Sequence, residues 1–508
     1  MSQLSLIQIF ALNAMAACIE LVYAVEGAYF VPAIYDSGVS QIYGSMLICI
    51  SPLMGTVFQS YLGTASDQCQ CTWGRRRPFI LGLTITCLIG LLLFPFTNDI
   101  SDLIDKPNLR KIVLIVLVVT ATFFSDFSAG SLQVPVRAYL LDVVPQSQTK
   151  LGNIAYSMCV GIGGITGFGI GAVKWSSIFT PSNDFSFQVM FVCITASCLV
   201  ILCAILNACS AREQVSYEIL RDSDDNHPSQ IQTNTTIYNN MPSDKATSLE
   251  NCDSHIKNKA KNCICFGNLL NSIKGNFVFM RYMSPSLVIL CVAYFFSLVG
   301  LYTQLYFFTS YMAEVIYDGD VNAPHNSTAY KDYTDGITFG SLALGISAVT
   351  GLVISLLLGP LMKLFGMRLV LVGSYVVLML ESGVLIVTHS AIVTILLAPA
   401  VYISLIIIFA IPFILASMYE DKGLLLRTTW PYSDTNLTGR TCAILGIACF
   451  VAQAFALLIN GPLIHLYGSV VSVMIVTCVT SFLGALVACF VTIPANDESS
   501  QAIKEQES

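Results

Sequence analysis

Four charged side chains inside long apolar segments of this sequence, where charge is rare, are candidates for chemistry. Glu20 and Glu26 fall in the first segment, and Asp126 and Arg137 fall in the fourth. A charged group inside a bilayer is costly, so it usually faces a cavity or a partner and marks a functional site. A buried acid that faces a cavity can take up and release a proton. We therefore predict that Asp126, Arg137 and Glu26 carry proton coupling.

The spacing of Asp126 and Arg137 places both on one side of a helix. They are 11 residues apart, which at about 100° per residue is close to three full turns and about 16 Å of rise. Asp126 then lies near mid-membrane and Arg137 nearer the cytosol. The alternative is a buried acid that only pairs with Arg137 or with another helix.

Other polar side chains inside apolar segments are candidates for contact with a solute. They could bind the hydroxyl groups of a polar solute, or they could equally hold a neighbouring helix. The candidates for the substrate cavity are Glu20, Tyr23, Gln133, Tyr302, Gln304 and Gln453.

A group of charges stands between the second and third apolar segments. Asp67 is followed by Arg75, Arg76 and Arg77, and Asp142 ends the fourth segment. Acids and arginines at helix ends can pair with one another and with the helix dipoles. We predict a cytosolic gate from these five residues. A plain topology signal is the simpler interpretation of the arginines, and both can hold.

Several other classes of function are disfavoured. Cys69-x-Cys71 and Cys263-x-Cys265 lack the second ligand pair of a zinc site, so we predict no metal and no cofactor. The sequence has no basic stripe interleaved with aromatics, so nucleic-acid binding is disfavoured. The glycine-rich run 161–171 lies in an apolar segment, where small residues let helices approach closely. We find no nucleophile–base pair in the sequence, so an enzyme is disfavoured.

The composition indicates a membrane protein. Of 508 residues, 55% are hydrophobic and 11% are charged, against about 25% charged in soluble domains. A membrane-spanning helix needs about 20 mostly apolar residues. We predict an all-α membrane protein with twelve spans in two six-helix halves. They run near 5–33, 41–63, 78–97, 111–141, 151–173, 187–209, 285–313, 336–362, 368–388, 391–417, 441–464 and 469–493.

The spans divide the chain into four parts. We predict an N-terminal half over 1–209, a C-terminal half over 285–493 and a short cytosolic tail over 494–508. The segment 210–284 between them is rich in Asn, Ser, Asp and Lys, so we predict a disordered cytosolic linker. Two related halves around a central cavity are typical of major facilitator transporters.

Basic residues set the predicted orientation, because cytosolic loops carry an excess of Lys and Arg. Most of them fall in alternate loops on the side of the N-terminus, so both termini are predicted to be cytosolic. Of the sequons at Asn234, Asn326 and Asn436, only Asn326 then lies outside and is a glycosylation candidate. The plasma membrane and an acidic organelle both remain open, and we expect a monomer.

The sequence resembles the solute carrier 45 family in both halves. The matching stretches are Tyr23-Ala-Val-Glu26-Gly-Ala-Tyr29-Phe-Val-Pro32, Trp73-Gly74-Arg75-Arg76-Arg77-Pro78, Arg137-Ala138-Tyr139-Leu140-Leu141-Asp142, Val315-Ile-Tyr317-Asp-Gly319-Asp320, Ile411-Pro412-Phe413 and Thr441-Cys442-Ala443-Ile444-Leu445. That family is similar to plant sucrose–proton symporters, whose fourth span pairs an acid with an arginine at the spacing seen here.

The resemblance implies a major facilitator fold with spans 1, 4, 7 and 10 around the cavity. It also implies that Asp126 accepts the proton, that Arg137 is its partner, and that the cargo is a sugar of the sucrose or glucose type. Two alternatives stay open. The same fold could carry an amino acid, a polyamine or another small solute, or the protein could be a membrane sensor that transports nothing.

Overall fold

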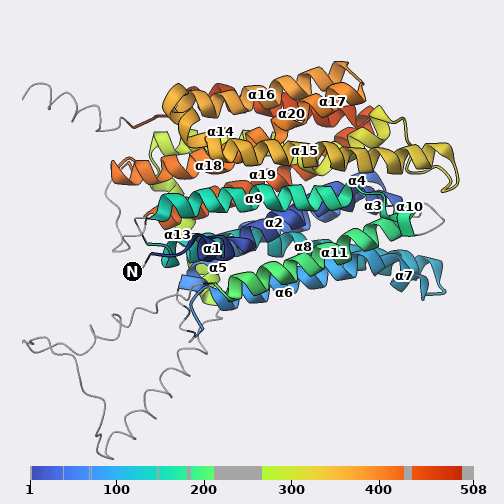
Figure 1. The fold of residues 1–508 in the computed structure, drawn as a ribbon, viewed down its shortest axis with the longest axis horizontal. Helices are drawn as coiled ribbons and strands as arrows, with labels where there is room; N and C mark the ends of the chain where they lie inside the picture. The colour runs from blue at the N-terminus through green and yellow to red at the C-terminus, as the bar shows by residue number, and fades with distance from the viewer. Residues whose placement is uncertain are drawn as a thin grey trace, which may run out of the picture.

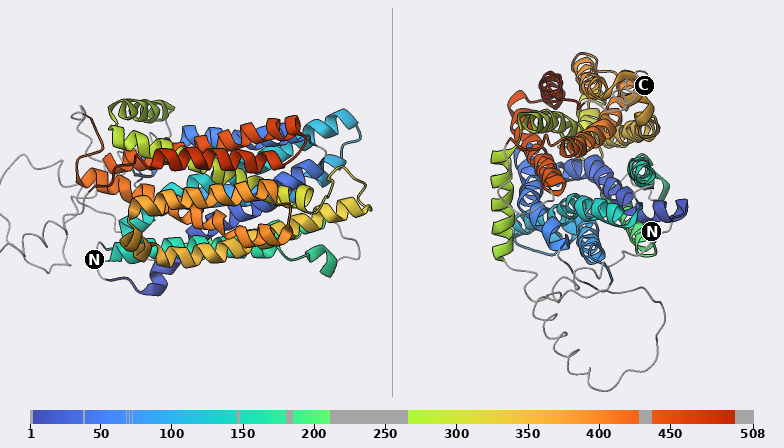
Figure 2. Two further views of the ribbon diagram at one scale, coloured as in Figure 1. Left: turned by 90° about the horizontal axis from the view of Figure 1, so that it is seen from above. Right: turned by 90° about the vertical axis from the view of Figure 1, so that its left-hand side faces the viewer.

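The fold is a bundle of long α-helices that run along one common axis (Figure 1). The computed structural model describes residues 3–37, 39–67, 69, 71, 73–145, 148–179, 185–210, 266–427 and 437–494. Seen along the bundle axis, the helices of the first half gather on one side and those of the second half on the other (Figure 2). The two halves therefore meet along a central interface.

The N-terminal half contains six spans, some of them built from more than one helix. Its elements are α1 (Leu6–Leu12), α2 (Ala14–Val25), η1 (Glu26–Phe30), α3 (Val31–Asp36), α4 (Gln41–Ile48), α5 (Ile50–Asp67), α6 (Arg77–Leu93), η2 (Phe94–Phe96), α7 (Thr97–Asp102), α8 (Pro107–Val143), α9 (Thr149–Gly171), α10 (Trp175–Phe179) and α11 (Phe185–Ala208).

The C-terminal half repeats this arrangement after a helix that precedes its first span. Its elements are α13 (Phe266–Tyr282), α14 (Pro285–Tyr311), η6 (Met312–Ile316), α15 (Thr328–Phe365), α16 (Met367–Val387), α17 (Ala391–Leu397), α18 (Pro399–Asp421), α19 (Leu437–Tyr467) and α20 (Val471–Ala488). The first span of each half includes a π-helical turn, η1 in one and η6 in the other.

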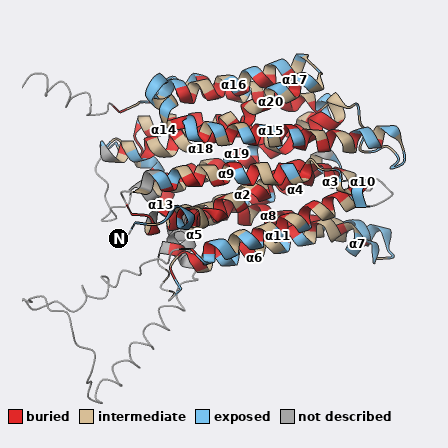
Figure 3. Ribbon diagram, viewed as in Figure 1, coloured by how far each residue is buried: buried red, intermediate tan, exposed pale blue. Residues whose placement is uncertain are grey.

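The structure confirms the twelve predicted spans. Within the described residues, 12 helical segments are long and apolar enough to cross a membrane. Exposed residues lie along the outward faces of the bundle (Figure 3), and many of them are large apolar residues that a soluble protein would bury. Examples are Leu92, Val116, Ile205, Leu356 and Phe482. Lipid tails are the natural environment for such a surface.

The bundle has two distinct ends, which we name by the position of the N-terminus. The proximal end holds the N-terminus together with the C-terminal ends of α5, α8, α15 and α18 (Figure 1). The distal end holds α7, α10 and the loop between η6 and α15. The last described residues are also proximal, because Arg368 at the start of α16 donates to the carbonyl of Val491.

Close packing in α9 explains its many glycines. A Cβ atom on Gly163 would lie 2.2 Å from the carbonyl oxygen of Ala17 in α2, and one on Gly167 would lie 2.6 Å from Cβ of Ala24. Span 1 therefore lies directly against span 5. This is the helix packing predicted for the glycine-rich run, because small residues let two membrane helices approach closely.

We expect Gly163→Ala to destabilise the protein by about 1–3 kcal/mol, the usual cost of overpacking. The added methyl group meets the backbone of α2, which cannot rotate away. The thermal unfolding midpoint of the purified protein measures this effect. Gly169→Ala is the matched control, because nothing lies within 4 Å of a Cβ atom there. Equal midpoints for the two variants would contradict the prediction.

The segment predicted as a disordered linker contains a helix at its end. Residues 211–265 lie outside the described part of the chain, as do residues 495–508 of the predicted tail. Residues 266–282 instead form α13. The reason is amphipathicity, since Phe279, and Met283 just after the helix, are buried on one side while the charged Lys274 and Arg281 are exposed.

Candidate functional site

The centre of the interface holds a buried carboxylate with partners from the other half. Asp126 in α8 is 3% exposed. Its Oδ1 accepts hydrogen bonds from the hydroxyl of Tyr306 in α14 at 3.2 Å and from Nε2 of Gln453 in α19 at 3.0 Å. Gln453 also donates to the Tyr306 hydroxyl. We call Asp126, Tyr306, Gln453 and the neighbouring Glu26 the central cluster.

Glu26 adds a second acid to the central cluster. It begins the π-helical turn η1, is 2% exposed, and lies close enough to Asp126 for the two carboxyl groups to interact electrostatically. No hydrogen bond from a described residue satisfies either oxygen of Glu26 or Oδ2 of Asp126. Two ionised carboxylates in one buried site repel each other, so a proton or a cation in this site would relieve the repulsion.

One face of α8 carries the candidate residues along the interface. Asp126, Gly130, Gln133 and Arg137 follow one another at spacings of three or four residues, which places them on a single stripe. A Cβ atom on Gly130 would lie 3.0 Å from the hydroxyl of Tyr23. Tyr23 and Gln133 are both half-buried. This stripe therefore faces span 1 and the C-terminal half.

Arg137 forms no ion pair with Asp126 or with any other described residue, which corrects the partnership that the resemblance implied. Its guanidinium instead lies 4.5 Å from the ring centre of Tyr156 in α9 and 4.9 Å from that of Phe413 in α18. The rise along the helix, about 16 Å over eleven residues, keeps it from Asp126. Two aromatic faces hold the cation in place of a carboxylate.

Two further candidates, Glu20 and Tyr302, have tyrosine or cysteine partners. The hydroxyl of Tyr402 in α18 donates to Glu20 in α2 at 2.6 Å. The hydroxyl of Tyr302 in α14 forms a 2.8 Å hydrogen bond with the Cys449 thiol. The rings of Tyr302 and Tyr306 are 6.4 Å apart. The structure thus places Glu20 in a contact between the halves, and it places Tyr302 beside Tyr306 of the central cluster.

Gln304 points away from the interface. Its Nε2 donates to Glu381 in α16 at 2.5 Å and lies 3.7 Å from the sulfur of Met474 in α20. Both partners belong to the C-terminal half. Glu381 is 2% exposed and was missed among the candidates. Its signal was present in the sequence, since no other Asp, Glu, Lys or Arg occurs between Arg368 and His389.

The predicted gate residues form a clamp inside the N-terminal half. Arg75 and Arg76 both reach Oδ2 of Asp142 at 3.1 Å. Arg76 also donates to Ser66 at 2.6 Å, and Arg77 donates to the hydroxyl of Tyr139 at 2.9 Å. These contacts join α5, α6 and α8 at the proximal end. The side chain of Asp67 lies outside the described part of the structure.

Contacts between the halves close the distal end. Lys174, after α9, forms a 2.7 Å ion pair with Asp335 in α15. The Tyr330 hydroxyl donates to Asp36 at 2.7 Å. Thr309 donates to the Ala28 carbonyl at 3.1 Å. In this state the central cluster is therefore covered on its distal side.

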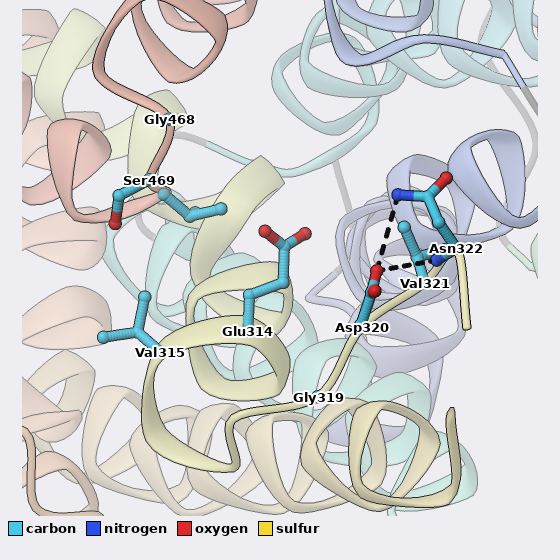
Figure 4. Close-up of a pocket in the computed structure, with 9 residues that line it drawn as sticks. Glu314, Val315, Gly319, Asp320, Val321, Asn322, Gly468 and Ser469 are labelled. Carbon is cyan, nitrogen blue, oxygen red and sulfur yellow. Dashed lines mark hydrogen bonds between the residues drawn. The ribbon is translucent and has the colours of Figure 1, made fainter. Parts of the chain in front are cut away.

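A small pocket at the distal end belongs to the C-terminal half alone. It has a volume of about 180 Å³ and lies between η6, the loop that follows it and the turn between α19 and α20 (Figure 4). Glu314, Asp320 and Ser469 supply its polar groups. Asp320 is engaged by Asn322, whose backbone N–H donates to it at 2.8 Å. The pocket does not include any of the predicted cavity residues.

Metal ligands and the glycosylation candidate complete the survey. Among the described residues, no group of three or more His, Cys, Asp or Glu could hold a metal ion. Asn326 is exposed in the distal loop between η6 and α15. The other two sequons, at Asn234 and Asn436, lie outside the described residues.

Comparison with known proteins places this geometry in a family. The sequence profile of the Major Facilitator Superfamily matches residues 12–424 of the chain. The chain belongs to the Major Facilitator Superfamily. Proteins of this family are transporters, so family membership identifies the chain as a membrane transporter and not an enzyme.

Similar proteins lie within solute carrier family 45, which confirms the resemblance found in the sequence. The membrane-associated transporter protein of Mus musculus is 28% identical and the match covers 93% of this chain and 90% of that protein. Solute carrier family 45 member 3 of Mus musculus is 25% identical over 82% and 70%. The proton-associated sugar transporter A of Homo sapiens is 24% identical over 95% and 86%.

Solved structures confirm the fold. A D-xylose–proton symporter superimposes with a TM-score of 0.57 at 13% sequence identity, and the match covers 96% of this chain and 97% of that one. The predicted fold, an all-α membrane protein with twelve spans in the major facilitator arrangement, is therefore confirmed.

Proposed function

We propose that this transporter moves a sugar together with protons by alternating access of its two halves. The observation that carries the proposal is the central cluster, in which the acid of one half is held by the hydroxyl and amide groups of the other. A solute with several hydroxyl groups can replace such hydrogen bonds one for one. The name of the related proton-associated sugar transporter A supports the same substrate class.

The proposed cycle uses the contacts between the halves as its switch. Asp126 and Glu26 together take up one proton, which relieves the repulsion between them. A solute then takes over the hydrogen bonds of Tyr306 and Gln453 with Asp126. The halves can then separate at one end and close at the other. Only a solute that binds the two states with different affinity can shift their populations in this way.

Labelled sucrose and glucose uptake tests the proposal directly. Cells that express the full chain are assayed at acidic and at neutral outside pH, with surface expression measured in parallel. We expect uptake to rise with outside acidity and to be abolished by a protonophore, which removes the proton gradient. Absence of uptake at either pH, with the protein at the surface, would contradict sugar uptake across the plasma membrane.

A solute with a cationic amino group, such as a polyamine or an amino acid, is the second candidate. One observation favours it: the oxygens of Glu26 have no hydrogen-bond donor among the described residues, and Arg137 is occupied by aromatic rings. A cation held by two ionised acids competes with protons. Uptake of labelled spermidine would therefore fall as the outside is acidified, which is opposite to the sugar symport.

We propose that the proximal end is cytosolic and that the halves are joined by the segment 210–284. The basic residues support this orientation. The described loops and loop-adjacent helices of the proximal end carry Arg75, Arg76, Arg77, Lys274, Arg281, Lys363, Arg368, Lys422, Arg427 and Arg440, and those of the distal end carry Lys106, Arg110, Lys111, Lys174 and Lys331. An excess of basic residues marks the cytosolic side.

Glycosylation tests this orientation. We expect Asn326→Gln to remove the N-linked glycan, because Asn326 is exposed on the distal, non-cytosolic side. The measurement is the gel mobility of the protein from mammalian cells, with and without a glycosidase. Asn436→Gln removes a sequon on the cytosolic side and serves as the control. A mobility change in that control, with none for Asn326→Gln, would reverse the orientation.

A further inference from the structure

Helix α13 has one side against the bundle and another side whose described residues are exposed. Asn276, Phe279 and Met283 are buried. At about 100° per residue they lie within one third of the helix circumference. The exposed residues lie on a separate arc of similar width. They are Lys274, Phe277, Met280 and Arg281.

The exposed arc combines apolar and basic side chains. Phe277 is 67% exposed and Met280 is 38% exposed. Lys274 and Arg281 lie on the same arc, two helical turns and about 10 Å apart along the axis. Both basic side chains are exposed. We call these four residues the outer face of α13.

The position of α13 places this outer face at the surface of the membrane. The helix ends two residues before α14 enters the bundle at Pro285. It contacts α5 of the N-terminal half and α19 of the C-terminal half at the proximal end. In the end-on view of Figure 2 it lies at the side of the bundle and runs from one half toward the other. A helix at this level lies among lipid headgroups.

We propose that the outer face of α13 is a binding site for anionic phospholipid headgroups. Phe277 and Met280 insert between the headgroups and the first acyl carbons, as the apolar face of an interfacial helix does. Lys274 and Arg281 then meet the phosphate and carboxylate groups of the lipid. Charge selects the ligand, because the two cations attract phosphatidylserine and gain little from zwitterionic phosphatidylcholine. This inference does not depend on the identity of the transported solute.

Native mass spectrometry of the detergent-purified full chain, titrated with phosphatidylserine or phosphatidylcholine, tests the proposal. We expect tighter binding of phosphatidylserine to the wild type. Each basic residue near an anionic surface is worth about fivefold in affinity. Lys274→Gln/Arg281→Gln should therefore weaken phosphatidylserine binding by about 25-fold and leave phosphatidylcholine binding unchanged.

Lys331→Gln/Lys363→Gln is the matched control, since it removes two exposed lysines elsewhere on the molecule. We expect this control to bind both lipids like the wild type. An equal loss of phosphatidylserine affinity in the control would show that net charge alone matters, and the proposed site would be wrong. Unchanged phosphatidylserine affinity in the α13 variant would also overturn it. Transport assays do not enter this test, so its failure leaves the proposed function untouched.

Discussion

Asp126→Asn is expected to lower the proton-driven accumulation ratio of the solute at least tenfold, which corresponds to about 1.4 kcal/mol of lost driving free energy. The asparagine side chain keeps the size of aspartate and an oxygen that can still accept from Tyr306 and Gln453. It cannot bind and release a proton. The central cluster therefore stays assembled while the proposed coupling is lost. Uptake measured over a range of outside pH should be flat in the variant.

Solute exchange separates an uncoupled transporter from an unfolded one. Exchange of labelled for unlabelled solute needs no net proton movement, so Asp126→Asn should retain it in proteoliposomes. Asp332→Asn is a suitable control for uptake, because it removes an exposed acid of α15 that lies outside the central cluster and outside the ion pair between the halves. A pH-dependent uptake by Asp126→Asn that matches the wild type would place the proton site elsewhere, with Glu26 as the next residue to test.

Lys174→Cys/Asp335→Cys is expected to give a transporter that a short bis-methanethiosulfonate reagent, which forms a disulfide with each cysteine, stops completely. The two side chains join the halves at the distal end, where their ion pair measures 2.7 Å. A covalent bridge at this point prevents the distal opening that alternating access requires. Uptake should fall to the level of untransfected cells and return when dithiothreitol removes the bridge.

The single variants Lys174→Cys and Asp335→Cys, treated with the same reagent, are the controls for this experiment. Each lacks one anchor of the bridge, so each should keep its uptake. They also account for the cysteines that the chain already contains, of which Cys198, Cys209 and Cys489 are exposed. A bridged double variant that still transports at the wild-type rate would show that the distal contact is not part of the cycle.

The sequence alone predicts the spans because hydrophobic length is a local property. The limits of α14 and α20 differ from the predicted spans by a few residues, since helix ends depend on caps such as Ser284. The amphipathic helix α13 was hidden by the polar composition of its neighbours in the segment 210–284. A local window that isolates residues 266–282 would have found its apolar periodicity.

The central cluster could be predicted only in part. Asp126, Glu26 and Gln453 are conspicuous as polar groups in apolar helices, so composition identifies them. Tyr306 is not conspicuous, because a tyrosine in such a helix is commonly a core residue. The partners of Arg137 come from α9 and α18, and no local pattern specifies which helices meet. Gln304 shows the same limit, since its position in α14 does not reveal that it faces Glu381.

Because the distal end is closed, the fraction of transporters in this conformation can be measured by their protection from a blocker added on the distal side. Ala28 and Thr309 join the two halves above Glu26 and Asp126, so a water-soluble blocker applied from that side does not reach the central cluster in this state. The share of molecules that resist such a blocker then equals the share that rests in this conformation. A non-transported analogue of the solute would divide the population in the same way, which gives inhibitor sidedness a direct structural meaning.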